Sequence, residues 1–499
     1  MKKLFVNIDT DDCGIRFLNR LTAQKRELTE SDLYPFIDLY AGSGVTDLLI
    51  CLSGQYSTSK SRVLSDSVFK YEQTVENGVP VDYKEKYTGI YTAYKQGIDP
   101  IKVWLDRCAE MGMTPWMSHR MNDRHCSRDV ASNLRPEFFY TARDNGWMLG
   151  EKYGSYKTCM NFAVPEVREL WLRYIDEQLS QYNVWGVELD FMREIHCFKY
   201  LDEPSSADIM TDFIRNVRAV VLRHAEKYGH EIKLGVRLSR SMSESCVFGF
   251  DAKKWDSEGL VDMIVVSPRW ETNDSDMPIK EWKSRIKNAE IYAGLETLTH
   301  PSGIMAQSSA DVSRALTNRY LSDGADGMYF FNHYPLPSPS TEEEMLRYER
   351  SMESFATCTS IEEAQSKGMR YIVTRQDIFP EGYSPYKPLP MKLKGGADIA
   401  LSIGKLPSER KVSLIVGYIG VIPDEVKLTV NGELLSTPIR YTPKPEGLRP
   451  SKDTSSGCAY VPEGSETYRY AVDTATDGSY RLSFSADRGA VTYIEFESI

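Results

Sequence analysis

Short stretches in which apolar and polar residues alternate recur along the first 345 residues of the chain. The clearest is 184–194, where Glu188 and Asp190 share one face of a strand and aliphatic or aromatic residues share the other. A buried carboxylate without a partner is too costly to keep, so we expect the acidic face to line a wet, shared or catalytic space. The same alternation predicts further strands at 4–9, 46–52, 113–119, 233–239, 263–270, 291–296 and 327–333.

Helical patterns separate these strands along the chain. They predict helices at 28–40, 100–111, 166–181, 206–228, 278–288, 309–322 and 341–355. Two connections, 53–99 and 120–162, are much longer than usual, and in a barrel such loops belong to the functional face. Eight strands alternating with helices over about 350 residues predict an α/β fold, a (β/α)₈ TIM barrel with enlarged loops after its strands.

The pattern changes beyond Thr359. After a short helical segment at 362–367, it predicts strands at 399–403, 412–416, 426–430, 468–472, 480–485 and 491–496. Asn431-Gly432, directly after the third of these strands, is a strong hairpin signal. We expect a catalytic barrel domain at 1–360, and a linker with a C-terminal all-β sandwich of about 100 residues at 361–499. The boundary is expected between 360 and 395, near Phe379-Pro380-Glu381-Gly382.

Composition and charge narrow the range of partners. The 499 residues are 41% hydrophobic, with a formal net charge of -11 at pH 7 and a pI near 5.4. Binding to nucleic acid or to an anionic membrane needs concentrated Lys and Arg, so we expect neither. The expected partner is small or neutral, and the sequence leaves the oligomeric state open.

The compartment is predicted from the start of the chain and from its cysteines. Asn7, Asp9 and the acids that follow interrupt the apolar run after Met1-Lys2-Lys3, which predicts a mature start rather than a leader. The nine cysteines are scattered without a Cys-x-x-Cys pair, a pattern typical of free thiols in a reducing compartment. We therefore expect a cytoplasmic protein; a leader already removed would place it in the periplasm or outside the cell.

Polar residues follow the predicted strands at their C-terminal ends, which a barrel brings together at one mouth. The candidate substrate-binding residues are Asp9, His119, Arg120, Asn122, Asp123, Glu188, Arg193, Arg237, Arg269, Trp270, Asn332 and His333. Acids and arginines at one mouth supply what cleavage of a glycosidic bond needs: a carboxylate, a proton donor and donors for sugar hydroxyls. The predicted substrate is therefore a carbohydrate.

Three carboxylates are candidates for the chemistry itself. Asp190 ends the fourth strand on the lumen face and is expected to carry the central negative charge. Glu296 ends the seventh strand and is preferred as proton donor over Glu271, because the polar residues 273–276 after Glu271 are typical of an exposed turn. A carboxyl separation of about 5 to 5.5 Å would predict retention of configuration, and about 6.5 to 9.5 Å would predict inversion.

Two other acidic features have structural interpretations. Glu188 lies one step deeper than Asp190 and is expected to form an ion pair with Arg237 or Arg269. The run of acids at 9–12 lacks the spaced Gly and terminal Glu of a calcium loop, so it is expected to be a helix-capping turn.

Motifs for metals and cofactors are not found. The seven histidines form no His-x-His or His-x-x-x-His pair, so no transition-metal site is expected. Gly-x-Gly-x-x-Gly, Gly-x-Ser-x-Gly and the P-loop are also absent from the sequence. The prediction is therefore a site without metal or cofactor.

Four segments occur in the order of one known family. They are Gly112-Met113-Thr114-Pro115-Trp116, Asn161-Phe162-Ala163-Val164-Pro165-Glu166-Val167-Arg168, Gly186-Val187-Glu188-Leu189-Asp190-Phe191-Met192-Arg193 and Tyr292-Ala293-Gly294-Leu295. Over residues 1–345 the chain resembles the family-10-like glycosyl hydrolase group of bacterial (β/α)₈ barrels, whose fourth strand ends in Leu-Asp-(aromatic)-x-Arg. The resemblance implies hydrolysis of a poly- or oligosaccharide, and it carries the family's acid onto Asp190 and its arginine onto Arg193.

The chain also departs from that family at the same strand. It reads Phe191-Met192-Arg193-Glu194-Ile195 where Tyr-Val-Arg-Tyr-Pro is usual, and it has Glu188 where His is common. These differences bear on the substrate more than on the fold.

Two other classes of function stay open at this point. A non-catalytic carbohydrate-binding barrel would keep its aromatics and arginines, but its carboxylates would be locked in ion pairs. A lyase or isomerase acting on an acidic sugar would use Arg120, Arg237 and Arg269 to hold the substrate carboxylate. Product analysis separates these classes, because hydrolysis yields a new reducing end without an unsaturated product.

Overall fold

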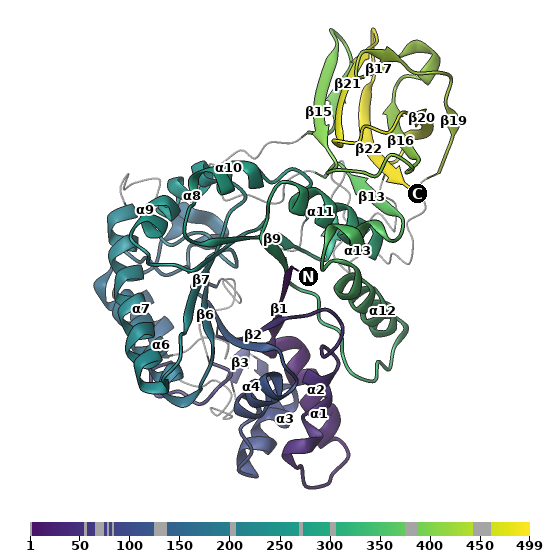
Figure 1. Cartoon of the computed structure of the whole chain (residues 1–499). Helices are drawn as coiled ribbons and strands as arrows, with labels where there is room; N and C mark the ends of the chain where they lie inside the picture. Colours follow the sequence, from purple (N-terminus) through teal and green to yellow (C-terminus); the bar gives the residue numbers. More distant parts are fainter. Residues whose placement is uncertain are drawn as a thin grey trace.

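The computed structural model of the protein describes residues 2–53, 57–64, 74–76, 79–81, 84–123, 137–199, 206–268, 273–299, 306–374, 388–442 and 461–499. Figure 1 shows a barrel formed by the N-terminal part of the chain and a smaller sheet domain formed by the C-terminal part. No helix in these ranges is long and apolar enough to cross a lipid bilayer.

Eight parallel strands close into a barrel, which confirms the predicted fold class. In chain order they are β1 (Lys3–Asp9), β2 (Asp47–Ser53), β5 (Thr114–Arg120), β6 (Gly186–Asp190), β7 (Lys233–Leu238), β8 (Met263–Val266), β9 (Glu290–Leu295) and β12 (Gly327–Phe330). The strands β8 and β12 end well before their predicted ends at 270 and 333. Pro268 has no N–H for the ladder after β8, and Asn332 takes a left-handed conformation (φ 61°) after β12.

Helices cover the outside of the barrel (Figure 1). They are α1 (Ile15–Thr22), α2 (Pro35–Asp38), α3 (Lys84–Lys95), α4 (Pro100–Glu110), α5 (Glu137–Asp144), α6 (Pro165–Gln181), α7 (Ala207–Tyr228), α8 (Met242–Val247), α9 (Ala252–Ser257), α10 (Ile279–Arg285), α11 (Ala310–Ser322) and α12 (Glu342–Thr357). Two short hairpins lie in the connections, β3 (Thr74–Glu76) with β4 (Val79–Val81) and β10 (Leu298–Thr299) with β11 (Ala306–Gln307).

Two local predictions near the N-terminus were wrong. The expected helix at 28–40 is a 3₁₀ turn, Glu30–Asp32, followed by α2, because Pro35 begins a new helix instead of continuing an earlier one. The acids after β1 do not form a capping turn. They belong to a π-helix, Thr10–Gly14, that leads directly into α1.

Apolar side chains fill the part of the lumen below the strand ends. This cluster consists of Phe5, Leu49, Trp116, Met263, Val265, Tyr292, Tyr329 and Phe331. Gly186 makes room for the largest of them, because a Cβ at this position would lie 2.1 Å from the Trp116 ring. The indole Nε1 of Trp116 donates to Asp47 Oδ1 at 3.0 Å. The lumen is therefore a packed core, and the polar positions above it are left to form a site.

The C-terminal part consists of two antiparallel sheets that form the predicted sandwich. One sheet contains β13 (Met369–Ile372), β14 (Met391–Lys392), β16 (Val412–Ile419), β19 (Ile439–Arg440), β20 (Glu466–Val472) and β22 (Ala490–Ser498). The other contains β15 (Ala397–Ser402), β17 (Lys427–Val430), β18 (Glu433–Leu434) and β21 (Ser479–Ser485). Asn431 (φ 51°) and Gly432 (φ 91°) make the predicted hairpin turn between β17 and β18.

The sandwich contacts the barrel through α11. The short helix α13 (Ile361–Gln365) precedes β13, and Gln365 donates to Asn318 Oδ1 at 2.9 Å and to the carbonyl of Lys405 at 2.8 Å. Asn318 in turn donates to the carbonyl of Ile403 at 3.0 Å. The proposed boundary segment 379–382 lies outside the described residues, so the domain limits stay a prediction.

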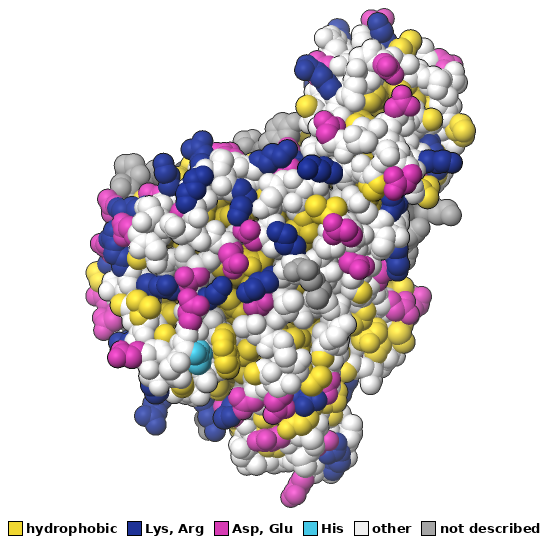
Figure 2. Space-filling view, viewed as in Figure 1, with side chains coloured by type: hydrophobic (Ala, Val, Ile, Leu, Met, Phe, Trp, Pro, Cys, Tyr) yellow, Lys and Arg dark blue, Asp and Glu magenta, His cyan; other side chains and the backbone are white. Residues whose placement is uncertain are grey.

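The surface carries charges of both signs. Figure 2 shows Lys and Arg interspersed with Asp and Glu on the viewed face of the barrel and the sandwich. Among the coloured side chains of this face, no continuous basic area stands out. This mixture of charges is in keeping with the formal net charge of -11.

Candidate functional site

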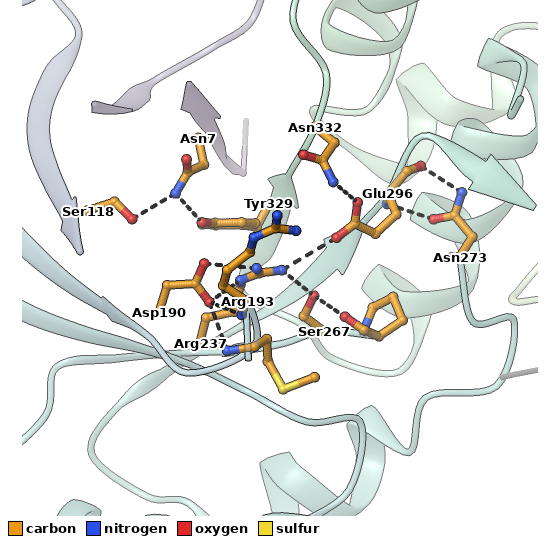
Figure 3. A network of polar contacts seen from close by, with 12 residues as sticks. Asn7, Ser118, Asp190, Arg193, Arg237, Ser267, Asn273, Glu296, Tyr329 and Asn332 are labelled. Atoms are coloured by element: carbon orange, nitrogen blue, oxygen red, sulfur yellow. Dashed lines mark hydrogen bonds and ion pairs between the residues drawn. The ribbon is translucent and has the colours of Figure 1, made fainter. Parts of the chain in front are cut away.

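Arg237, on β7, is the centre of a buried polar network at the C-terminal ends of the strands (Figure 3). Its Nε and Nη2 donate to Asp190 Oδ1 and Oδ2, each at 2.9 Å. Its Nη1 faces Ser267 Oγ at 3.2 Å and Glu296 Oε1 at 3.4 Å. The guanidinium lies 3.8 Å from the centroid of the Phe331 ring. One arginine thus joins a carboxylate of the fourth barrel strand to a carboxylate of the seventh.

Asp190 is fully buried, and its two oxygens are occupied by the bidentate pair with Arg237. Oδ1 also accepts the backbone N–H groups of Met192 at 2.8 Å and Arg193 at 3.0 Å. Burial alone would lower the pKa of the Arg237 guanidinium, but the charge of Asp190 raises it. The pair is therefore an ionised anchor that fixes both Arg237 and the start of the loop after β6.

Glu296 follows β9 and is also fully buried. Its Oε2 accepts from Asn332 Nδ2 at 2.9 Å. The Asn273 side chain holds the Glu296 backbone on both sides, donating to its carbonyl at 2.8 Å and accepting its N–H at 2.9 Å. Asn332 is one of the non-glycine residues in the left-handed region, and Tyr334 donates to its Oδ1 at 2.6 Å. Strained backbone of this kind is concentrated at functional sites.

Glu188 sits one layer below Asp190 on β6. Its Oε2 accepts from Asn7 at 3.0 Å, from Ser118 at 2.6 Å and from Tyr329 at 3.0 Å. Its Oε1 is buried and has no hydrogen-bond partner. Burial, and then the nearby charge of Asp190, raise the pKa of Glu188 to about 7. This carboxyl can hold a proton close to neutral pH.

A second ion pair lies across the mouth. Arg120, at the end of β5, donates to Asp9 Oδ2 at 2.7 Å. Its guanidinium lies 6.0 Å from the centroid of the same Phe331 ring that Arg237 covers. Two arginines, each holding a carboxylate of the chain, therefore flank Phe331.

Three residues predicted to contact substrate lie away from this network. The His119 ring meets Tyr174 of α6 edge-on at 5.4 Å, and the His333 ring meets Phe330 edge-on at 4.8 Å. Both rings are fully buried, and burial lowers the pKa of each to about 3. His119 lies between the lumen positions Ser118 and Arg120, so strand alternation turns its ring outward. His333 has the parity of the lumen residues Tyr329 and Phe331, but the left-handed Asn332 interrupts the alternation before it.

The third is Asn122, whose side-chain amide is engaged in holding loops. It donates to the carbonyls of Met160 and His196 at 2.9 and 2.8 Å and accepts the N–H of Met160 at 2.9 Å. This side chain stabilises the connection after β5 instead of facing the lumen.

The remaining predicted residues divide into two groups. Asp123 is buried beyond the end of β5, and Arg193 is half-buried beside Arg237 and Tyr329 in Figure 3. Arg269, Trp270 and Glu271 lie outside the described residues. Glu188 was predicted to pair with Arg237 or Arg269; Arg237 pairs with Asp190 instead, and Arg269 lies outside the described residues.

Comparison with known proteins finds similarity in fold alone. No family model matches the chain. No curated protein matches it either. Among solved structures, the chitinase ChiW from Paenibacillus sp. str. FPU-7 is 8% identical with a TM-score of 0.43, covering 98% of this chain and 56% of that one. A putative alpha-L-fucosidase from Bacteroides thetaiotaomicron is 10% identical with a TM-score of 0.38, covering 99% and 94%.

A third similar structure is a family 18 N-acetylglucosaminidase from Paenibacillus barengoltzii, 9% identical with a TM-score of 0.38, covering 72% of this chain and 100% of that one. These neighbours are glycoside hydrolases by description, but likenesses this distant describe the fold. Any assignment of function has to come from the side chains at the mouth.

Several members of the network were not among the residues predicted from the sequence. Tyr329 and Ser118 occupy lumen positions of predicted strands, so their parity was a usable signal. Asn273 was assigned to an exposed turn, yet it is buried together with Asp274 and Ser275.

Within the described ranges, no group of three or more His, Cys, Asp and Glu side chains is arranged to hold a metal ion.

Proposed function

We propose that this chain is a glycoside hydrolase in which Glu296 is the catalytic carboxylate and Glu188 is the proton donor. One observation supports it above the others. Arg237 orients carboxylates from the fourth and seventh strands, while burial raises the pKa of the neighbouring Glu188 to about 7. A glycosidase needs one carboxyl that is protonated and another that is ionised at the same pH. Neighbouring carboxyls whose surroundings give them different pKa values meet this requirement.

Asp190 takes a positioning role in this proposal, although its strand position predicts the central charge. Both of its oxygens are engaged by Arg237, and two backbone N–H groups also bind Oδ1. Glu296 accepts from the Asn332 amide, and its contact with Nη1 of Arg237, at 3.4 Å, is longer than either contact of Asp190 with the same guanidinium. We therefore assign to Glu296 the charge that stabilises a positive sugar ring.

The proton donor is assigned to Glu188 for its chemistry. A carboxyl with a pKa of about 7 is protonated in a large fraction of molecules at neutral pH and can protonate a leaving oxygen. Asn7, Ser118 and Tyr329 all donate to Oε2, so the proton belongs on Oε1. Glu271 is the competing donor and enters the same experiment.

The test begins with a panel of 4-nitrophenyl glycosides and matching oligosaccharides, scored for new reducing ends and for unsaturated products. Glu296→Gln should then lower kcat by several orders of magnitude on both kinds of substrate. Replacing the true proton donor should slow oligosaccharide cleavage far more than release of 4-nitrophenol, which needs no protonation.

The control is Glu433→Gln, on exposed β18, which should leave both rates unchanged. Near-normal turnover by Glu296→Gln on a confirmed substrate would refute the role of Glu296. A leaving-group effect in Glu271→Gln instead of Glu188→Gln would move the proton donor to Glu271.

A non-catalytic carbohydrate-binding barrel is the second candidate, and the two ion pairs at the mouth favour it. Asp190 with Arg237 and Asp9 with Arg120 are the locked carboxylates that such a barrel would show. It would bind oligosaccharides from the panel and release no product. A lyase or isomerase fits less well, because Arg120 and Arg237 already hold carboxylates of the chain and are not available to clamp an acidic sugar.

A further inference from the structure

The Glu296 backbone is held by a side chain that takes the place of a neighbouring strand. Asn273 Nδ2 donates to the Glu296 carbonyl at 2.8 Å, and Asn273 Oδ1 accepts the Glu296 N–H at 2.9 Å (Figure 3). The N–H of Asn273 donates to the carbonyl of Leu298 at 2.7 Å, which ties both residues to the same loop. The position of the Glu296 carboxylate therefore depends on where Asn273 lies.

Asn273 begins a tight polar turn that ends at Asp276. Asp274 Oδ1 accepts the Asp276 N–H at 2.9 Å, and Asp274 Oδ2 pairs with Arg240 at 2.5 Å. A hydrogen bond from a side chain to the backbone two residues later closes a compact turn. Asn273, Asp274 and Ser275 are all buried. A displacement of Ser275 is therefore passed on to Asn273, because the turn between them is not free to relax into solvent.

The middle of this turn is bound by the C-terminal sandwich. The Ser275 N–H donates to Thr374 Oγ1 at 3.0 Å, and the Thr374 N–H donates to Ser275 Oγ at 3.2 Å. The Tyr371 hydroxyl donates to the Ser275 carbonyl. Tyr371 lies in β13, Thr374 follows two residues after that strand ends, and both side chains are buried. One short segment of the sandwich thus satisfies the N–H, the carbonyl and the hydroxyl of Ser275.

The barrel holds the same turn from its other side. Tyr320 of α11 donates to the Asp274 carbonyl, next to the residue that the sandwich binds. A buried N–H or carbonyl that loses its partner is costly, so the turn keeps this conformation only while both sets of contacts are in place. Three hydrogen bonds link the sandwich to Ser275, and two link Asn273 to the Glu296 backbone. The path from the sandwich to the carboxylate is therefore short and continuous.

We infer that the C-terminal sandwich is a functional part of the mouth, in which Thr374 and Tyr371 are positioning residues that hold Glu296 in place through the turn at Asn273. This inference rests on the proposed catalytic role of Glu296 and gives the second domain a part in it. The contacts of Thr374 and Tyr371 described above go to Ser275, so both residues act through the turn. A small displacement of a catalytic carboxylate lowers turnover, because stabilisation of the transition state depends on its placement.

Hydrogen exchange followed by mass spectrometry tests this coupling without any substrate. Thr374→Val keeps the shape of the side chain but removes the acceptor of the Ser275 N–H, whereas Thr374→Ser keeps that acceptor. The Glu296 amide, followed in peptic fragments that contain it, should exchange at least tenfold faster in Thr374→Val, because its acceptor Asn273 is no longer held. Thr374→Ser should exchange at the parent's rate. Tyr371→Phe, a milder change, should speed exchange of the same fragments.

The matched controls are Thr492→Val and Tyr418→Phe, each of which removes the hydrogen bond of a buried hydroxyl inside the sandwich. Neither should change exchange of the Glu296 amide. The inference is overturned if Thr374→Val and Tyr371→Phe leave this exchange unchanged, or if the controls speed it equally.

The second measurement uses the substrate found with the glycoside panel. Thr374→Val should lower kcat about tenfold and leave KM within about twofold, and Thr374→Ser should restore kcat. In a chain that already carries Glu296→Gln, the same change should not lower the residual rate further, because the carboxylate that it displaces is gone. An equal loss in both backgrounds would show a general effect on the fold and would overturn the inference.

The two measurements separate failure of the inference from failure of the proposed hydrolase. A parent chain that cleaves none of the panel refutes the hydrolase, yet exchange of the Glu296 amide still decides whether the sandwich positions this residue. An unchanged kcat in Thr374→Val on a confirmed substrate refutes the inference and leaves the hydrolase intact.

Discussion

Glu188→Gln removes an ionisable group from the barrel lumen while keeping the size of the side chain and an oxygen for its three donors. Burial, with a smaller contribution from Asp190, raises the pKa of Glu188 from its ordinary value of 4.5 to about 7. Between those two pH values the unfolded chain binds fewer protons than the folded chain, so ionisation of Glu188 lowers stability as the pH rises. The difference between the two pKa values corresponds to a loss of roughly 3 kcal/mol in the free energy of unfolding at pH 8.

The variant should therefore gain stability in a pH-dependent way. At pH 8 it should unfold with a free energy roughly 3 kcal/mol above that of the parent, and at pH 5 the gain should be less than about 1 kcal/mol. Urea unfolding followed by tryptophan fluorescence measures this change in the relevant domain, because all 8 tryptophans lie between residues 104 and 282. Glu433→Gln, on the exposed strand β18, should show no such dependence on pH.

Two results would refute the reasoning. A gain that is equal at pH 5 and pH 8 would mean that Glu188 does not change its protonation state within that window. A loss of stability at pH 8 would mean that Asn7, Ser118 and Tyr329 stabilise the charged form by more than burial opposes it.

Three further predictions concern the rest of the chain. Asp190→Asn leaves Arg237 buried without its anchor, so urea unfolding should show a loss of about 3 to 5 kcal/mol; a loss below about 1 kcal/mol would contradict the anchoring role. Asn332→Gly relieves the left-handed strain but releases Glu296, so kcat should fall although the variant is more stable than Asn332→Ala by about 1 kcal/mol. Equal stabilities of the two variants would argue against strain. Thiol titration of the native protein should find Cys246 fastest among the seven described cysteines, because the other six are buried, and all 9 should react after unfolding without reductant.

Strand alternation was sufficient to predict which side chains enter the lumen. Glu188 and Asp190 share the inner face of β6, and Arg237 and Glu296 lie on the corresponding faces of β7 and beyond β9. Side-chain direction in a strand follows from the backbone alone, so no knowledge of the neighbouring strands is needed. The same rule would have excluded His119. It would have kept His333, whose parity matches Tyr329 and Phe331, because the left-handed conformation of Asn332 is not visible in the alternation.

The partners of these side chains depend on register, which the sequence does not display. Glu188 was expected to pair with Arg237 or Arg269, whereas in the barrel Asp190 is level with Arg237 and Glu188 is level with Gly235. Register is set by the stagger with which all eight strands close. It is therefore a property of the whole barrel rather than of any one strand.

Contacts between the two domains explain why the turn that begins at Asn273 was wrongly predicted to be exposed. The run after Asn273 looked like an exposed turn because it consists of polar residues. In the fold, the N–H of Ser275 donates to Thr374 Oγ1 at 3.0 Å, and Tyr371 donates to the carbonyl of Ser275. The start of the C-terminal sandwich covers this turn, and a contact across about 100 residues of chain leaves no local pattern to detect.

The difference between Glu188 and Asp190 bears on whether the barrel is an enzyme or a binding module. Asp190 is held by an arginine, as every carboxylate of a non-catalytic mouth would be. Glu188 forms no ion pair with any described residue, and one of its oxygens has no hydrogen-bond partner. A module that only binds sugar gains nothing from this carboxyl, because glutamine would accept the same hydrogen bonds without a buried ionisable group. A glutamate has an advantage over glutamine at this position only if it donates a proton and takes one back during a reaction. Glu188→Gln therefore separates the two: a binding module would become more stable and bind as before, whereas an enzyme would become more stable and lose turnover.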